Sequence, residues 1–462
     1  MLSRRALKLR AVRALVASCL LAVGSVPALG AGWGAGKARV AITPKTPTWM
    51  AGYGSRDKPS EGTIHDLWAK ALVLRDPSGR LATLVTLDIC GIGRDLSTRI
   101  RDDLKRRHGL ERDRIVLACS HTHTGPVVGS NLISMYKIDD EQRRQIAAYA
   151  ETFVEAVTGV VDEAIKHIEP AELSWGTGKA DFAVNRRNNK EPEVPSLRER
   201  MELQGPIDHD LPVLRVQGPD GEVRAVVFGY ACHCTVLGLN KFSGDYAGFA
   251  QIALEREIPG AQAMFVAGCG ADQNPIPRRT VELAEAYGNQ LAEGVQRVLH
   301  GSMRPIATSL VSSYEEIPLD FAKLPTREQV EADARSNDFF IASRARSLLK
   351  ILESKESLDA SYPYPIQVWR LGDLTWVFLG GEVVVDYSLR IKRNLGSSHT
   401  WVSGYCNDVM AYIPSLRVLT EGGYEGAGAM VYYGLPSPWS EAVEVSIIHA
   451  VDRLVDATKP KT

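Results

Sequence analysis

The sequence predicts an α/β fold with a mixed β-sheet core and helices packed on its faces. Apolar segments of strand length alternate along the chain with longer segments whose apolar residues recur every three or four positions. Turn sequences at 76–79, 219–221 and 372–373 each separate two apolar segments, which predicts three hairpins. Hairpins pair strands antiparallel and helical crossovers pair them in parallel, so we expect a mixed sheet.

The expected strands are short apolar runs, most of them bounded by turn-forming residues. In chain order they lie at 39–42, 62–74, 81–89, 115–119, 172–176, 182–187, 211–216, 223–232, 263–267, 310–319, 364–371, 374–379 and 400–402. The expected helices share a helical apolar repeat or a polar, charged surface pattern. They lie at 97–108, 141–168, 245–257, 280–300, 383–393 and 440–457, with one or two more within 325–356. Ser97 is a candidate N-cap for the first of them.

The connecting segments give no sign of a second domain. The segment 188–206 is polar and contains prolines without clear periodicity, so we expect a loop there. The chain has no internal repeat and no low-complexity linker after its first 30 residues. Residues 31–462 are therefore predicted to form one domain.

The first 30 residues have the pattern of an export signal. Five basic residues between positions 4 and 13 precede an apolar segment at 14–26, and Ala28-Leu29-Gly30 offers small residues for cleavage before Ala31. The apolar segment is shorter than the ~20 residues that a membrane-spanning helix needs. We therefore expect a periplasmic or secreted protein without a membrane span or a lipoprotein anchor. The pair Arg4-Arg5 leaves the twin-arginine export route open.

The composition is that of a globular protein with a large core, 45% hydrophobic and 24% charged. Lys plus Arg total 54 and Asp plus Glu total 55, which gives a net charge of -1. This balance offers no electrostatic basis for binding nucleic acid.

Six cysteines follow the export signal, namely Cys90, Cys119, Cys232, Cys234, Cys269 and Cys406. Export and an even number both permit disulfides. Five of the six lie in apolar strand-like runs or beside histidines, so we expect free buried thiols. One disulfide is the alternative.

The apolar run 115–119 ends abruptly in His121-Thr122-His123-Thr124-Gly125-Pro126. Residues at i and i+2 of an extended chain point to the same face, so His121 and His123 are expected to enter one cavity. The alternative is a pair of hydrogen-bonded turn histidines. Other strand ends strengthen the first interpretation.

Three further strands also end in polar side chains. His233 ends the second hairpin, Asp272 and Asn274 follow the strand 263–267, and Glu382 follows the strand 374–379. Ligands collect where the strands of an α/β sheet end, so we expect these clusters to converge at one edge. Four separate, internally satisfied turns are the alternative.

Imidazole nitrogens and a carboxylate are the usual non-thiol ligands of zinc, so Zn²⁺ is the expected cofactor. A catalytic zinc site leaves a position open for water and lowers its pKa to about 7. Cys232 and Cys234 flank His233 along a strand and are expected to face the opposite side, in the core. The sequence contains no Gly-x-Ser-x-Gly elbow, His-Glu-x-x-His helix, phosphate-binding loop or dinucleotide fingerprint.

An ordered set of motifs carries a family resemblance. The set consists of Gly62-Thr63-Ile64-His65, the motif from His121 to Pro126, Asn185-Arg186, Asp210-Leu211-Pro212-Val213-Leu214, His233, Ser243-Gly244-Asp245, Asp272, Gly381-Glu382, Tyr412 and Tyr424-Glu425-Gly426. The chain thereby resembles the N-terminal catalytic domain of the neutral ceramidase family, zinc-dependent amidases that split ceramide into sphingosine and a fatty acid. After Gly434 we expect only a closing helix.

The resemblance implies a complete set of site residues. His121, His233, Glu382 and Tyr412 would bind zinc, and Tyr412 enters this set by resemblance alone. His123, Arg186 and Tyr424 would line the reacting carbonyl. Two positions depart from the family pattern. Asn274 stands where the family has a serine, and Arg187 stands where it favours one.

The resulting expectation is an exported zinc hydrolase that cleaves an N-acyl amide, such as a ceramide-like lipid amide, by attack of metal-bound water. Glu382 would shuttle the proton, while His123, Arg186 and Tyr424 would stabilise the oxyanion. Asp272 and Asn274 are expected to contact the substrate. The alternatives are a zinc hydrolase of an ester, a lactone or a sugar-linked amide, and a binding protein of the same family that has lost turnover.

Overall fold

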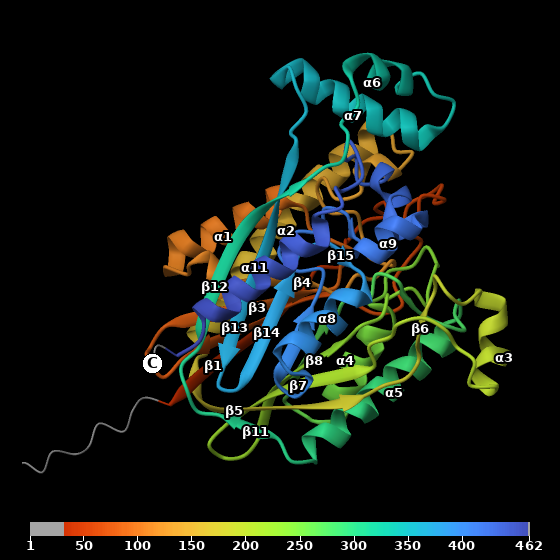
Figure 1. Ribbon diagram of the computed structural model, residues 1–462. Coiled ribbons are helices and arrows are strands. Elements are labelled where there is room, and N and C mark those ends of the chain that lie inside the picture. The colour runs from red at the N-terminus through yellow and green to blue at the C-terminus, as the bar shows by residue number, and fades with distance from the viewer. Residues whose placement is uncertain (1–31, 461–462) are drawn as a thin grey trace, which may run out of the picture.

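The computed structural model describes residues 32–460, and the expected export signal lies outside this range (Figure 1). A nine-stranded mixed sheet forms the centre, with the order β4-β3-β2-β1-β5-β7-β8-β9 and β11 paired beside β5. Its strands are β1 (Trp33–Ala41), β2 (Trp68–Arg75), β3 (Leu81–Leu87), β4 (Ile115–Cys119), β5 (Glu169–Lys179), β7 (Asp210–Gln217), β8 (Val223–Tyr230), β9 (Gln262–Ala267) and β11 (Arg304–Ile306). The β3–β4 and β8–β9 pairs are parallel and the others antiparallel, which confirms the predicted mixed sheet.

A second, four-stranded sheet has the order β12-β13-β14-β16. Its strands are β12 (Val311–Asp320), β13 (Ser361–Leu371), β14 (Leu374–Leu379) and β16 (Thr400–Ser403). Two short ribbons complete the strands, β6 (Ala183–Asn185) with β10 (Gln273–Pro275), and β15 (Glu382–Val383) with β17 (Tyr412–Ile413). All three predicted hairpins are present, as β2–β3, β7–β8 and β13–β14.

The two sheets pack face to face, because successive side chains along each strand point alternately toward the other sheet and toward the outer helices. On β2, Leu72 and Leu74 point toward the second sheet and join a cluster that includes Trp376 and Trp401. The intervening Val73 points away and joins the cluster beneath the helices of the outer face. The rings of Trp376 and Trp401 stack 3.9 Å apart in this interface. The class was predicted correctly, but helices cover only the outer face of each sheet.

Helices form the two outer layers (Figure 1). The nine-stranded sheet is covered by α1 (Arg94–His108), α2 (Asp140–Lys166), α4 (Asp245–Glu257) and α5 (Val281–Leu299), whose buried residues share one cluster with that sheet. The smaller sheet is covered by α8 (Val385–Leu395) and α11 (Val443–Ala457). The helices α6 (Arg327–Asp333) and α7 (Phe339–Lys355) pack together in the predicted excursion, at the top of Figure 1.

Short helical segments connect these layers. They are η1 (Arg112–Arg114), η2 (Ile133–Met135), η3 (Glu191–Glu193), α3 (Val194–Glu199), η4 (Ser397–His399), α9 (Leu416–Glu421), α10 (Gly423–Gly426) and η5 (Gly428–Val431). The segment expected to be a loop at 188–206 therefore contains η3 and α3. No helix within 32–460 combines the length and the apolar character needed to cross a bilayer.

Three expected helix starts were wrong, and one of them is that of α11, which begins at Val443 instead of residue 440. The first helix begins at Arg94 after Gly93, and Ser97 lies inside it, with its N–H donating to the carbonyl oxygen of Gly93 at 3.0 Å. Helix α8 begins two residues later than expected, because Val383 pairs with Ile413 in the β15–β17 ribbon. The expectation of free thiols was correct, since all six cysteines of the described range are buried and unbridged.

Candidate metal centre and active site

His121 lies just beyond the C-terminal end of β4. The strand ends at Cys119 and the chain turns at His121, whose φ is +60°. The backbone N–H of His121 donates to the carbonyl oxygen of Ile89 at 3.0 Å, and its Nδ1 lies 2.6 Å from the carbonyl oxygen of Cys90. A carbonyl oxygen only accepts, so Nδ1 carries the proton and Nε2 presents a lone pair.

His233 reaches the same point from the end of β8. Its backbone N–H donates to the carbonyl oxygen of Gln273 at 2.9 Å, and its Nδ1 donates to that of Gly270 at 2.8 Å. Its Nε2 therefore also presents a lone pair. Burial and the nearby guanidinium of Arg186 lower the pKa of His233 to about 4, so the imidazole is neutral at physiological pH.

Glu382 places a carboxylate between the two imidazoles. Its Oε2 lies 3.0 Å from Nε2 of His121 and 3.2 Å from Nε2 of His233. The hydroxyl of Tyr433 donates to the other oxygen, Oε1. Oε2 itself is buried and receives no hydrogen bond from the part of the chain that the structure describes. Three acceptor atoms thus face one another in a buried site.

A cation bound between these three atoms would satisfy all of them. Although burial opposes it, the carboxylate of Glu382 raises the pKa of His121, so a metal ion at this point would compete with a proton. Although burial opposes this shift too, the histidines hold the pKa of Glu382 well below its usual range. Metal binding displaces such protons. The ligand atoms of His121, His233 and Glu382 lie within 4.8 Å of one another, and their types fit zinc. The two Nδ1–carbonyl bonds orient the imidazoles as in known zinc sites.

Tyr412 borders this group. Strand β17 pairs in parallel with β15, which sets Tyr412 opposite Glu382. The Tyr412 hydroxyl lies 3.3 Å from Nε2 of His233 and accepts a hydrogen bond from Nη2 of Arg186 at 3.1 Å. The structure therefore brings together all four residues that the resemblance implied as ligands.

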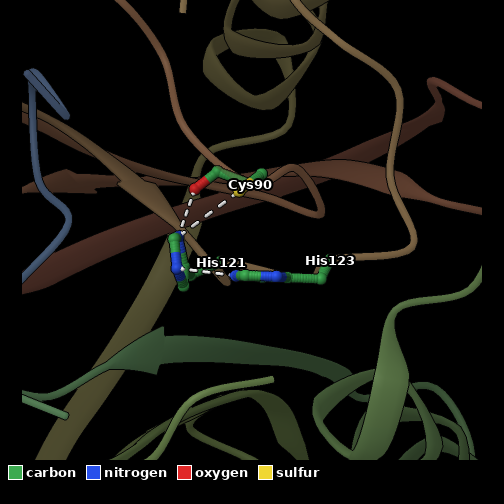
Figure 2. A group of neighbouring side chains, drawn as sticks. All are labelled: Cys90, His121 and His123. Atoms are coloured by element: carbon green, nitrogen blue, oxygen red, sulfur yellow. Dashed lines mark hydrogen bonds between the residues drawn. The ribbon is translucent and has the colours of Figure 1, made fainter. Parts of the chain in front are cut away.

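Cys90, His121 and His123 form a second possible metal group, which shares His121 with the first (Figure 2). The Sγ of Cys90 lies 3.7 Å from Nδ1 of His121. That nitrogen already donates to the Cys90 carbonyl, so only Nε2 of His121 can bind a metal, and this atom faces Glu382 at 3.0 Å. The group of His121, His233 and Glu382 is therefore the better site.

His123 faces the cavity beside this group. Its Nε2 lies 3.1 Å from Nε2 of His121, and its ring contacts the edge of Tyr53 at a centroid distance of 4.9 Å. Burial and the neighbouring His121 and His233 lower the pKa of His123 well below its usual range, so this imidazole is neutral. A Cβ on Gly52 would lie 2.4 Å from the His123 ring, and Gly52 has φ +93°, so glycine is required there.

Arg186 follows β6 and is fixed by three hydrogen bonds. Its Nε donates to Oε1 of Glu425 at 2.7 Å, Nη1 donates to Oδ1 of Asn274 at 3.2 Å, and Nη2 donates to the Tyr412 hydroxyl. Although burial opposes it, Tyr412 and Glu425 raise the pKa of Arg186 well above its usual range. The guanidinium also lies 5.8 Å from the ring centre of Tyr424.

A cavity of about 650 Å³ lies next to the His121, His233 and Glu382 group, from which His123 and Tyr412 separate it. The expected residues that line it are His123, Arg186, Asn274, Tyr412 and Tyr424. Its size is within the usual range for small-molecule sites. A polar, positively charged group therefore lies beside a candidate metal site in a space that admits a small substrate.

Asp272 does not line this cavity, contrary to its expected contact with substrate. Its Oδ1 accepts from the backbone N–H of Val385 at 2.8 Å, and its Oδ2 accepts from Nδ2 of Asn185 at 3.1 Å. Burial raises the pKa of Asp272 to about 6. Asp272 therefore ties the start of α8 to the end of β6, beneath the site.

Two motifs of the resemblance hold the histidine loop in place. The hydroxyls of Thr122 and Thr124 both donate to the carbonyl oxygen of Ser243 at 2.8 Å. The Oγ of Ser243 lies 3.0 Å from Nε2 of His65. The carboxylate of Asp245 accepts hydrogen bonds from backbone N–H groups just after His233, at 236 and 237. The segments 62–65 and 243–245 thus act as supports for both histidine-bearing segments.

Sequence reasoning missed Tyr433 and gave no role to Glu425 and Arg187. Tyr433 has no motif around it, and only its position against Glu382 shows its part in the site. Glu425 lay inside a recognised motif, and its carboxylate binds both Arg186 and Arg187. The pairing of acidic and basic residues so far apart in the chain has no local signal.

The fold and the site define an α/β protein with a buried His/His/Glu group that could hold a metal ion at the ends of its strands. Comparison with known sequences then gives the family. The model described as "Neutral/alkaline non-lysosomal ceramidase, N-terminal" matches residues 33–274, more than half of the chain. The protein therefore belongs to the neutral/alkaline ceramidase family, as the motifs predicted.

Individual relatives are distant in sequence. The neutral ceramidase of Pseudomonas aeruginosa is 22% identical over 514 residues, which cover 94% of this chain and 74% of that protein. Neutral ceramidase A of Dictyostelium discoideum is 25% identical over 241 residues, covering 49% of this chain and 33% of that protein.

Solved structures share the fold. The crystal structure of the neutral ceramidase from Pseudomonas aeruginosa matches with a TM-score of 0.70 at 19% identity, covering 92% of this chain and 75% of that one. A structure titled "Ceramidase complexed with C2" matches with a TM-score of 0.71 at 18% identity, covering 93% and 77%. These likenesses establish the overall architecture.

Proposed function

We propose that this protein is an exported zinc-dependent amidohydrolase that cleaves linear N-acyl amides. The observation that carries the proposal is the meeting of the Nε2 atoms of His121 and His233 with a buried carboxylate oxygen of Glu382, at 3.0 and 3.2 Å, next to a substrate-sized cavity. Membership of a family whose named relatives are ceramidases supports amide hydrolysis.

His121, His233 and Glu382 would hold the zinc, with Tyr412 at its edge. When bound, the ion would polarise the substrate carbonyl as a Lewis acid and would lower the pKa of a water molecule to near neutrality. Arg186 binds the carbonyl oxygen of the substrate, because its guanidinium is fixed by Glu425 and lines the cavity. A hydrogen-bond donor in such a position contributes about 3 kcal/mol to transition-state stabilisation.

Proton transfer falls to His123 in this scheme. Glu382 was expected to carry the proton, but its Oε1 accepts from Tyr433 and its Oε2 faces the two histidines beneath the cavity. His123 lines the cavity, with its Nε2 3.1 Å from Nε2 of His121, so its imidazole is placed to take a proton from the attacking water and give it to the departing amine. Tyr424, at the cavity wall, completes the contacts around the carbonyl.

The experiment combines metal analysis with turnover. We expect His121→Ala and His233→Ala to lose both bound zinc and the release of fatty acid from a panel of N-acyl amides that includes ceramide. His167→Ala is the matched control, because His167 is exposed on the surface beyond α2. Hydrolysis by either site variant at the wild-type rate would contradict the proposal.

Export is proposed from residues 1–30 alone. We expect the protein recovered from the periplasm or medium to begin at Ala31, which mass spectrometry of the intact protein would show. Recovery of the full-length chain from the cytoplasm alone would contradict it.

A further inference from the structure

Many side chains that line the cavity are charged or can form hydrogen bonds, and their chemistry indicates which class of substrate fits. Seven of its lining residues carry a charge, namely Arg186, Arg187, Lys190, Glu191, Arg278, Glu421 and Glu425. Among the described residues that line the cavity, Ile276 is the one aliphatic side chain. A long hydrocarbon chain gains free energy by leaving water only where the receiving surface is apolar. The apolar surface of these walls comes mainly from tyrosine rings, which are flat and edged with hydroxyl groups, and hardly from aliphatic side chains.

The wall charges are fixed in ion pairs. The Nη1 of Arg187 donates to Oε2 of Glu425 at 2.7 Å, and Nη2 donates to Glu421 at 3.1 Å. Across the cavity, Nη2 of Arg278 donates to Oε2 of Glu191 at 2.6 Å. An alkyl chain laid on these pairs would remove their water without replacing its hydrogen bonds. A hydroxyl-bearing group would replace them.

Arg187 restricts the cavity at one side. Its side chain is 11% exposed and links the segment after β6 to the α9–α10 segment, where it also donates to the carbonyl oxygen of Gly422 at 3.0 Å. A serine side chain at this position is too short to reach Glu421, Gly422 or Glu425. The guanidinium Nε is buried and has no hydrogen-bond partner among the described residues.

Further groups in the wall have unused hydrogen-bonding capacity. Thr235 is only 3% exposed, lines the cavity, and its Oγ1 has no partner in the described part of the chain. Asn274 uses its Oδ1 for Arg186, and no hydrogen bond from its Nδ2 to a described residue is present. The rings of Tyr53 and Tyr424 add flat, amphipathic surfaces to the same cavity.

We infer that this site selects compact N-acyl amides whose amine part carries several hydroxyl groups over amides with a long hydrocarbon chain, and that Arg187 determines this selection. The inference rests on the proposed amidase function and narrows its substrate class. A buried polar group left unpaired by the wrong substrate is what makes such discrimination strong.

The test compares two amides that release the same product. The zinc-loaded enzyme is assayed for acetate release from N-acetylglucosamine and from N-acetylsphingosine, which differ only in the amine part. We expect kcat/KM to be at least tenfold higher for N-acetylglucosamine. Arg187→Ser should lower that ratio at least tenfold, whereas Arg99→Ser, which breaks a surface ion pair with Glu151, should leave it unchanged. A preference for N-acetylsphingosine, or an unchanged ratio in Arg187→Ser, overturns the inference and leaves the amidase proposal standing.

Failure of the amidase proposal gives a different result. If neither amide is hydrolysed, calorimetric titration of N-acetylglucosamine into wild-type protein and Thr235→Val decides the inference by binding alone. Valine has the shape of threonine, and the lost hydroxyl has no internal partner, so the variant should fold normally. We expect binding by the wild type and at least fivefold weaker binding by the variant. Absence of binding by the wild type, or equal affinities, refutes the inference.

Discussion

The hydroxyl of Tyr433 offers the sharpest test of the metal site, and Tyr433→Phe removes that hydroxyl alone. It donates to Oε1 of Glu382, whose other oxygen faces His121 and His233. Glu382 is 3% exposed, so water does not readily replace the lost donor. Loss of a hydrogen bond to a buried charged group costs about 1.5–3 kcal/mol.

Typical changes in metal affinity give a similar cost for losing the Tyr433 hydroxyl. Removing a group that supports a metal ligand typically lowers affinity about 10–100-fold. This factor equals about 1.4–2.7 kcal/mol, which agrees with the hydrogen-bond value. We therefore expect Tyr433→Phe to bind zinc 10–100 times more weakly than the wild type, while the ring continues to pack in place.

The assay is competition for zinc with a chromophoric chelator at fixed pH. Tyr432→Phe is the matched control, because the Tyr432 ring packs on Phe340 and Tyr424 and donates no hydrogen bond to Glu382. We expect its affinity to stay within about twofold of the wild type. Equal zinc affinity in Tyr433→Phe and the wild type would refute the assignment of Glu382 as a ligand supported by Tyr433.

Three more predictions concern the surrounding structure. Burial raises the pKa of Asp408 to about 7, so folded protein retains a proton that the unfolded chain releases, and stability falls as pH rises from about 4 to about 7. Asp408→Asn should remove this pH dependence and be more stable than the wild type at pH 8, by about 4 kcal/mol at most. If urea denaturation gives the same difference in free energy of unfolding between variant and wild type at pH 5 and at pH 8, the prediction is wrong. Thr122→Val removes a hydroxyl that donates to the carbonyl oxygen of Ser243, so we expect the free energy of unfolding to fall by about 1–3 kcal/mol. We also expect a lower kcat at full zinc occupancy, and an unchanged kcat would show that this hydrogen bond is not needed to position the histidines. Trp401→Ala empties the stack with Trp376 between the sheets and should cost about 3–5 kcal/mol in denaturant unfolding, with less than about 1 kcal/mol arguing against a packed interface.

The sequence was informative wherever a signal was local. Apolar runs followed by polar residues located the ends of β4 and β8 and the start of β15, and with them His121, His233 and Glu382. Their convergence followed from the rule that strand ends share an edge. The reasoning for His123 was less accurate, because the chain turns at His121 with φ +60° instead of continuing as a strand, although both rings still meet.

Asp272 shows the limit of the same reasoning. Its position after a strand was read as a contact with substrate, yet both carboxylate oxygens are used by Val385 and Asn185. A polar residue at a strand end either faces the cavity or holds neighbouring segments together. Sequence spacing does not distinguish these outcomes, because the partner groups come from other parts of the chain.

The sequence by itself determined the mixed α/β class, the three hairpins, the free thiols and the residue types of the candidate metal site. These follow from periodicity, turn chemistry and donor type, which neighbouring residues encode. Only the tertiary structure decided that two sheets pack face to face, that carbonyl oxygens of Cys90 and Gly270 fix the histidine tautomers, and that Arg187 crosses to Glu425. The reason is physical: a buried polar group must find a partner, and that partner is chosen by the packing of segments distant in the chain.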